Sequence, residues 1–87
     1  MNIKPTKFAQ TLSPWKQFAK VVSEADELDA EMHEAPIDPR KAADEAIDLA
    51  RAAVTLACSI CHNYGLDAAQ VVAENEAKCE RKGYFEE

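Results

Sequence analysis

The sequence predicts an all-α fold built from three helices. Two expected helix starts join a capping side chain to a proline, at Ser13-Pro14 and Asp38-Pro39, a combination that favours the first turn of a helix. The chain has two glycines, and each follows a stretch with helical spacing. Glycine readily adopts the left-handed backbone conformation that ends many helices. Between these signals, apolar residues recur at intervals of three and four. We therefore expect residues 1–87 to form a single helical domain.

A short arm, residues 1–12, precedes the first expected helix, residues 14–34. The apolar stripe of this helix has the spacing of one face and comprises Phe18, Val21, Val22, Ala25, Leu28 and Met32. Glu24, Glu27 and Glu31 lie beside the stripe. Carboxylates at the edge of a buried stripe can face a cleft between helices, which is a geometry suited to a functional site.

The second and third expected helices cover residues 39–64 and 67–82. Between Ile47 and Cys61 the second helix is apolar on nearly all sides, which is typical of a helix in the middle of a bundle. The third helix has fewer apolar positions. Antiparallel packing of the first two helices would bring the second half of one beside the first half of the other.

Size and charge narrow the class of protein. A chain of 87 residues and 9.6 kDa gains limited stability from its own core, so we expect an oligomeric bundle, a homodimer or homotetramer. The net charge of −6 argues against binding along duplex nucleic acid, which needs a basic face. No apolar run approaches the roughly 20 residues of a membrane span, and no secretory signal is readable. A cytoplasmic protein that does not insert into a membrane is therefore expected.

Two acidic pairs are the strongest functional signal. Glu24 and Glu27 are three residues apart, as are Glu45 and Asp48, and 17 residues separate the two pairs. Helical residues at i and i+3 share a face, where like charges repel by a few tenths of a kcal/mol. A divalent cation between the four carboxylates would relieve this repulsion. Mg²⁺ is the expected cofactor, with Mn²⁺ as a substitute, because Mg²⁺ takes carboxylate oxygens together with substrate phosphates.

The chain resembles the MazG-like all-α nucleoside triphosphate pyrophosphohydrolases, including their small phage-type members. The resemblance rests on the two acidic pairs, in the order ExxE then ExxD, and on the C-terminal run 75–85 with its NxxK spacing. That run departs from the family's RGY-type ending because Lys82, not arginine, directly precedes Gly83. The similarity covers residues 15–85, most of the chain.

The resemblance implies hydrolysis of a nucleoside triphosphate to its monophosphate and pyrophosphate, with Mg²⁺ as cofactor. It assigns metal binding and catalysis to an acidic quartet, Glu24, Glu27, Glu45 and Asp48, with one carboxylate orienting the attacking water. It places substrate contacts in two regions, with Asn75, Lys78, Arg81 and Lys82 near the C-terminus and Trp15 and Gln17 at the start of the first helix. The ring of Trp15 could stack on a base.

Other interpretations compete with this one. A non-catalytic helical module that binds a nucleotide or a protein partner would use the same bundle, and a single acidic pair is usually a solvated helix face. Trp15 is also a candidate anchor for the core or an interface, and the basic residues near the C-terminus could only complement the negative end of the third helix. The pattern Cys58-x-x-Cys61-His62 matches haem c attachment. Its place inside a long apolar helix favours small core cysteines instead.

Overall fold

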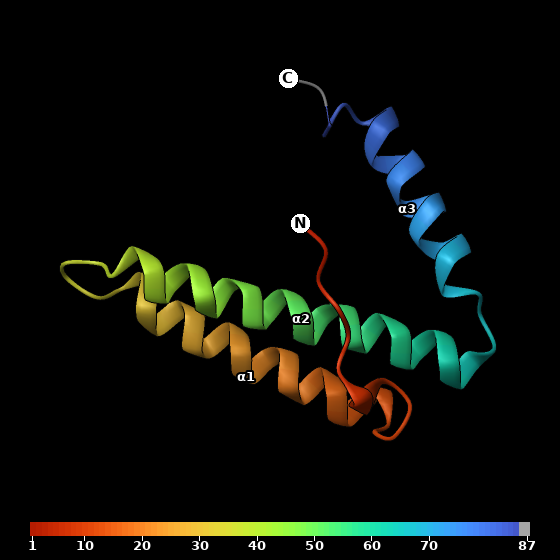
Figure 1. The fold of residues 1–87 in the computed structure, drawn as a ribbon, viewed down its shortest axis with the longest axis horizontal. Coiled ribbons are helices and arrows are strands. Elements are labelled where there is room, and N and C mark those ends of the chain that lie inside the picture. Colours follow the sequence, from red (N-terminus) through yellow and green to blue (C-terminus); the bar gives the residue numbers. More distant parts are fainter. Residues whose placement is uncertain (86–87) are drawn as a thin grey trace.

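The computed structural model describes residues 1–85 and is entirely helical (Figure 1). The elements follow one another as η1 (Lys7–Ala9), α1 (Pro14–Met32), α2 (Pro39–Tyr64) and α3 (Ala68–Arg81), and the described residues include no strand. The predicted all-α class with three helices is confirmed. α1 ends two residues earlier than expected, and α3 is one residue shorter at each end. Within this described part, no helix has the length and apolar character that crossing a membrane requires.

Local signals in the sequence fix where the helices begin and end. Ser13 Oγ accepts a hydrogen bond from the N–H of Lys16 at 3.3 Å. In the same way, Asp38 Oδ1 accepts from the N–H of Lys41 at 3.1 Å, so both helices start on a side-chain cap followed by proline. α2 ends at Gly65, whose φ of 68° is left-handed, a conformation that glycine adopts without steric cost.

α1 and α2 lie side by side and antiparallel, whereas α3 leaves the C-terminal end of α2 and projects away from the pair (Figure 1). Gln17 is buried at the contact between α1 and α2, where its side-chain amide donates to the carbonyl of Ala52 at 3.1 Å. α1 and the N-terminal arm cover α2 on two sides. The expected central position of α2 is met only in part, because Ile60 and Tyr64 remain exposed.

The N-terminal arm is held on α2 by side chains of that helix. Thr55 is fully buried, and its Oγ1 accepts from the N–H of Thr6 at 3.0 Å while donating to the carbonyl of Arg51 at 2.7 Å. One turn further on, Ser59 Oγ donates to the carbonyl of Leu12 at 3.2 Å. These two hydroxyl residues interrupt the apolar run of α2 because they anchor the arm.

Replacing Thr55 by valine should loosen the arm. Valine keeps the shape of threonine but cannot accept the hydrogen bond from Thr6, and the loss of one such bond costs about 1 kcal/mol. We expect that decrease in the free energy of unfolding, measured with denaturant, and faster amide exchange over residues 4–12. Ser23→Ala, at an exposed position of α1, is the control. Unchanged exchange in the arm would contradict this account of how it is held.

Candidate functional site

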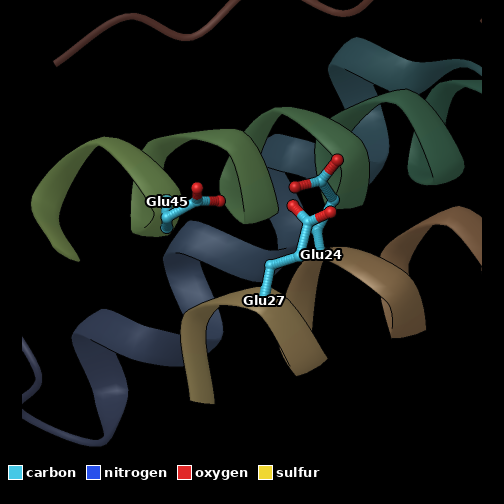
Figure 2. Close-up of side chains that lie close together, drawn as sticks. All are labelled: Glu24, Glu27 and Glu45. Atoms are coloured by element: carbon cyan, nitrogen blue, oxygen red, sulfur yellow. The ribbon is translucent and has the colours of Figure 1, made fainter. Parts of the chain in front are cut away.

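Carboxylates from α1 and α2 converge in the space between the two helices (Figure 2). One carboxylate oxygen from each of Glu24, Glu27 and Glu45 lies within 4.8 Å of the other two. Glu24 and Glu27 belong to the second half of α1, and Glu45 belongs to the first half of α2. Antiparallel packing brings these halves together. We call these three residues the acidic trio.

Asp48, the fourth residue of the predicted quartet, borders the acidic trio. It is exposed and follows Glu45 by three residues on α2, so it projects from nearly the same side of the helix. Its negative charge is among the causes that raise the pKa of Glu24 and of Glu45. The structure therefore brings three of the four predicted carboxylates together and places the fourth at the rim.

Two oxygens of the acidic trio are buried without a partner. Oε2 of Glu24 and Oε2 of Glu45 are shielded from solvent, and no group within residues 1–85 forms a hydrogen bond with either one. Burial first, and then the charge of Glu27, raise the pKa of both carboxyls. Lys20 Nζ, 3.8 Å from Glu24 Oε1, acts in the opposite direction on Glu24. A buried carboxylate oxygen without a partner is unfavourable, so a cation in this space would stabilise the protein.

The donors of the acidic trio fit a hard divalent cation. Carboxylate oxygens are the ligands that Mg²⁺ prefers, and the octahedral ligands of that ion lie about 3 Å apart when adjacent and about 4.2 Å apart when opposite. The trio's oxygens lie within 4.8 Å of one another, so they would move closer together to bind one such ion. Glu31, the next acidic residue along α1, is paired with Lys41 at 3.0 Å and so is already neutralised.

A pocket of about 500 Å³ opens beside the acidic trio, between the arm, α1 and α2. The residues that line it are Thr6, Phe8, Leu12, Gln17, Lys20, Glu24, Asp48, Arg51 and Ala52. Lys20 and Arg51 place cationic groups next to the carboxylates, and Phe8 contributes an aromatic ring from the arm. Arg51 Nη1 donates to the carbonyl of Lys4 at 2.9 Å, which orients the guanidinium while leaving further N–H donors.

Sequence reasoning missed the cationic and aromatic groups of this pocket. Lys20 precedes Glu24 by four residues, and Arg51 follows Asp48 by three. Both spacings put a basic group on the same helix face as a predicted ligand, and this signal could have revealed them. Phe8 carries no comparable signal, because the arm reaches the pocket only through its long-range hydrogen bonds with α2.

The residues predicted to contact substrate have different surroundings. Gln17 lines the pocket beside the trio, although its amide is engaged with Ala52. Trp15 is 79 % exposed and lines a separate apolar pocket with Phe18 and Tyr64.

The other residues predicted to contact substrate are exposed on α3 or at its end. They are Asn75, Lys78, Arg81 and Lys82. α3 starts from the C-terminal end of α2, whereas the trio lies towards the opposite end (Figure 1), so a single chain does not join these two groups.

The cysteines that match the haem pattern lie in α2 and form no disulfide. Cys61 is buried and Cys58 is half-buried. Both line a pocket against the N-terminal arm together with His62. Their position between packed segments agrees with the role of small core residues.

The fold and the site define an all-α protein with a cluster of three glutamates between two antiparallel helices. Comparison of the chain with protein-family models, with curated proteins and with solved structures gave no match. The MazG-like resemblance therefore stays a prediction that rests on the chain's own acidic pairs and C-terminal run.

Replacing Glu45 by glutamine should stabilise the metal-free protein at neutral pH. The folded-state pKa of Glu45 lies above its ordinary value of 4.5, so its ionisation weakens the fold as the pH rises through that raised pKa, and the penalty is absent below 4.5. Thermal unfolding in EDTA should give a higher Tm for Glu45→Gln than for the parent protein at about pH 7, and a similar Tm at about pH 4.

Glu76→Gln provides the matched control for this measurement, because Glu76 is an exposed glutamate of α3. Its Tm should follow that of the parent protein at both pH values. A Glu45→Gln variant that is less stable than the parent protein in EDTA at neutral pH would contradict the account of repulsion in the trio.

Proposed function

We propose that the chain is a Mg²⁺-dependent nucleoside triphosphate pyrophosphohydrolase, acting as a cytoplasmic homo-oligomer. The observation that carries this proposal is the acidic trio, with two buried carboxylate oxygens that lack a partner. The adjoining pocket, lined by two basic residues and an aromatic ring, supports a phosphorylated, ring-containing substrate. The order and spacing of the acidic pairs resemble the MazG-like enzymes and support the same reaction.

Glu24 and Glu27 on α1 and Glu45 on α2 would hold the cation, and Asp48 at the rim offers a further carboxylate. When bound there, Mg²⁺ supplies positive charge that offsets the negative charge of the phosphates in the transition state. The three glutamates would in turn lose their mutual repulsion. Metal binding and stability of the α1–α2 contact are therefore coupled in this proposal.

Lys20 and Arg51 would bind the phosphates of the substrate. Both line the pocket that also contains Glu24 and Asp48, so phosphate oxygens held by them would lie next to the acidic trio. The planar guanidinium of Arg51 can donate two parallel hydrogen bonds to a phosphate. Phe8 would pack against the base, since aromatic side chains stack on any nucleobase.

In the proposed reaction, a water oxygen forms a bond to the α-phosphorus. The bond from that phosphorus to the α,β-bridging oxygen breaks, and pyrophosphate leaves with its electron pair. One proton of the water passes to a carboxylate. The carboxylate that accepts it must have an oxygen that is not bound to the cation, and Asp48 at the rim offers one.

Glu24→Gln should lower the rate of pyrophosphate release at least about 100-fold, because the neutral amide removes one charge from the proposed cation site. The purified protein would be incubated with a panel of nucleoside triphosphates, with Mg²⁺ or with EDTA. Chromatography would separate monophosphate, diphosphate and pyrophosphate. We expect monophosphate and pyrophosphate from the parent protein, no product in EDTA, and an unchanged rate for the control Glu76→Gln.

Two other results would reject the proposal. Diphosphate and orthophosphate would show cleavage at a different bond. Nucleotide binding in calorimetry that is independent of Mg²⁺ and yields no product would instead identify the non-catalytic binding module. Glu24→Gln must retain its helical circular dichroism for either comparison to count.

Phe8→Ala should raise KM about 10-fold with little change in kcat, because base stacking contributes about 1–3 kcal/mol of binding and the ring takes no part in bond cleavage. Phe85→Ala is the matched control, since Phe85 is an exposed phenylalanine beyond α3. Steady-state kinetics with the preferred triphosphate would measure both constants. Equal effects of the two substitutions would exclude Phe8 as the base-stacking residue.

A further inference from the structure

Large apolar side chains collect on one side of the α1–α2 pair. We define the apolar face by six of them, Trp15, Phe18 and Val22 on α1 and Leu56, Ile60 and Tyr64 on α2. Trp15 is 79 % exposed and Tyr64 is 72 % exposed, and Phe18, Val22 and Ile60 are also exposed. No member of this face is charged. Contiguous apolar surface of this kind marks an interaction site.

The apolar face contains a pocket. A pocket of about 410 Å³ is lined by Pro14 together with five of the six residues of the face. The rings of Trp15 and Phe18 meet edge to face, with centroids 6.2 Å apart, an arrangement that favours aromatic pairs. The face therefore offers both projecting aromatic rings and a hollow that can receive an apolar side chain.

The apolar face and the acidic trio lie on different sides of α1. Phe18 and Glu27 are nine residues apart, so they point in directions about 180° apart around a helix that turns about 100° per residue. The trio and its pocket belong to the side of the arm. On α1, a partner that covers the apolar face would thus contact the side opposite the trio.

The accessible surface of the chain is too large for a protein of its mass. It amounts to 6770 Å², whereas a folded monomer of 9.6 kDa exposes about 5,100 Å². The difference, about 1,700 Å², is roughly twice the 800 Å² that each partner buries in a standard interface. The projecting α3 accounts for part of this surface, and the apolar face contributes to it through its exposed side chains Trp15, Phe18, Val22, Ile60 and Tyr64.

We infer that a second copy of the chain covers the apolar face, so that the protein is a two-fold symmetric dimer in which this face meets itself. Contact of one surface with the same surface of a second copy requires that no like charges oppose one another, and the six residues meet that condition. Trp15 would then be an interface anchor, in keeping with the prominence of tryptophan among residues that dominate binding. This dimer does not depend on the proposed activity.

Val22→Glu tests the inference directly. The isologous contact would place the new carboxylate in the interface twice, and burial of an unpaired charge is strongly unfavourable, so the dissociation constant should rise at least about 100-fold. Light scattering coupled to size exclusion should give twice 9.6 kDa for the parent protein and the single-chain mass for the variant. Val72→Glu is the matched control, because Val72 is similarly exposed but lies on α3, and it should remain dimeric.

The fluorescence of Trp15 tests the same inference without any substitution. Trp15 is the single tryptophan of the chain, so a dimer through the apolar face should shield it from iodide and shift its emission to shorter wavelength. Dilution should reverse both effects together with the loss of mass. Circular dichroism would confirm that Val22→Glu remains helical, and Ile60→Lys, from the α2 side of the face, would replace it if it does not.

Three results would overturn the inference. A parent protein with the single-chain mass at every concentration would show that no second copy covers the face. Dissociation by Val72→Glu with an intact Val22→Glu dimer would place the interface on α3. A shielded Trp15 in a monomer would mean that a segment of the same chain covers the face.

Discussion

The antiparallel packing of α1 against α2 is the constraint on which the site depends. Two contacts between α1 and α2 fix the register of the helices. These are the hydrogen bond from Gln17 to Ala52 and the ion pair of Glu31 with Lys41. The acidic trio lies between them. A slip of one helical turn would move one helix by about 5.4 Å, more than the 4.8 Å within which the three oxygens meet. The trio therefore exists only in this register.

This register brings negative charges together between α1 and α2, where burial makes their repulsion stronger than in water. Glu24 and Glu45 each bury an oxygen that has no partner among residues 1–85, and burial, followed by the charge of the neighbouring carboxylates, raises the pKa of both. Glutamine at these positions would relieve the repulsion without a change of shape. A local conflict of this kind in an otherwise consistent helical pair is typical of a functional site, and it is the physical basis for the proposed cation.

The sequence predicted the helices well because their signals are local. Ser13 and Asp38 cap α1 and α2 through residues three positions away, and the acidic pairs have helical spacing. The path of the N-terminal arm could not be predicted in this way. It depends on hydrogen bonds that Thr55 accepts from Thr6 and that Ser59 donates to Leu12, each joining residues 47 or more positions apart in the chain. The pocket wall that the arm forms, including Phe8, was missed for the same reason.

The two sides of α1 explain why Trp15, which the resemblance placed in contact with the base, does not line the pocket beside Glu24. Trp15 precedes the first acidic pair in sequence, yet it lies on the apolar face, while Phe8 from the arm lines the pocket beside Glu24. If a second copy covers the apolar face, Trp15 is buried in the interface, on the side of α1 opposite the trio. The chain's net charge of −6 opposes association at long range. An uncharged face, which on α1 lies opposite Glu24 and Glu27, is a surface on which two such acidic chains can meet with little repulsion.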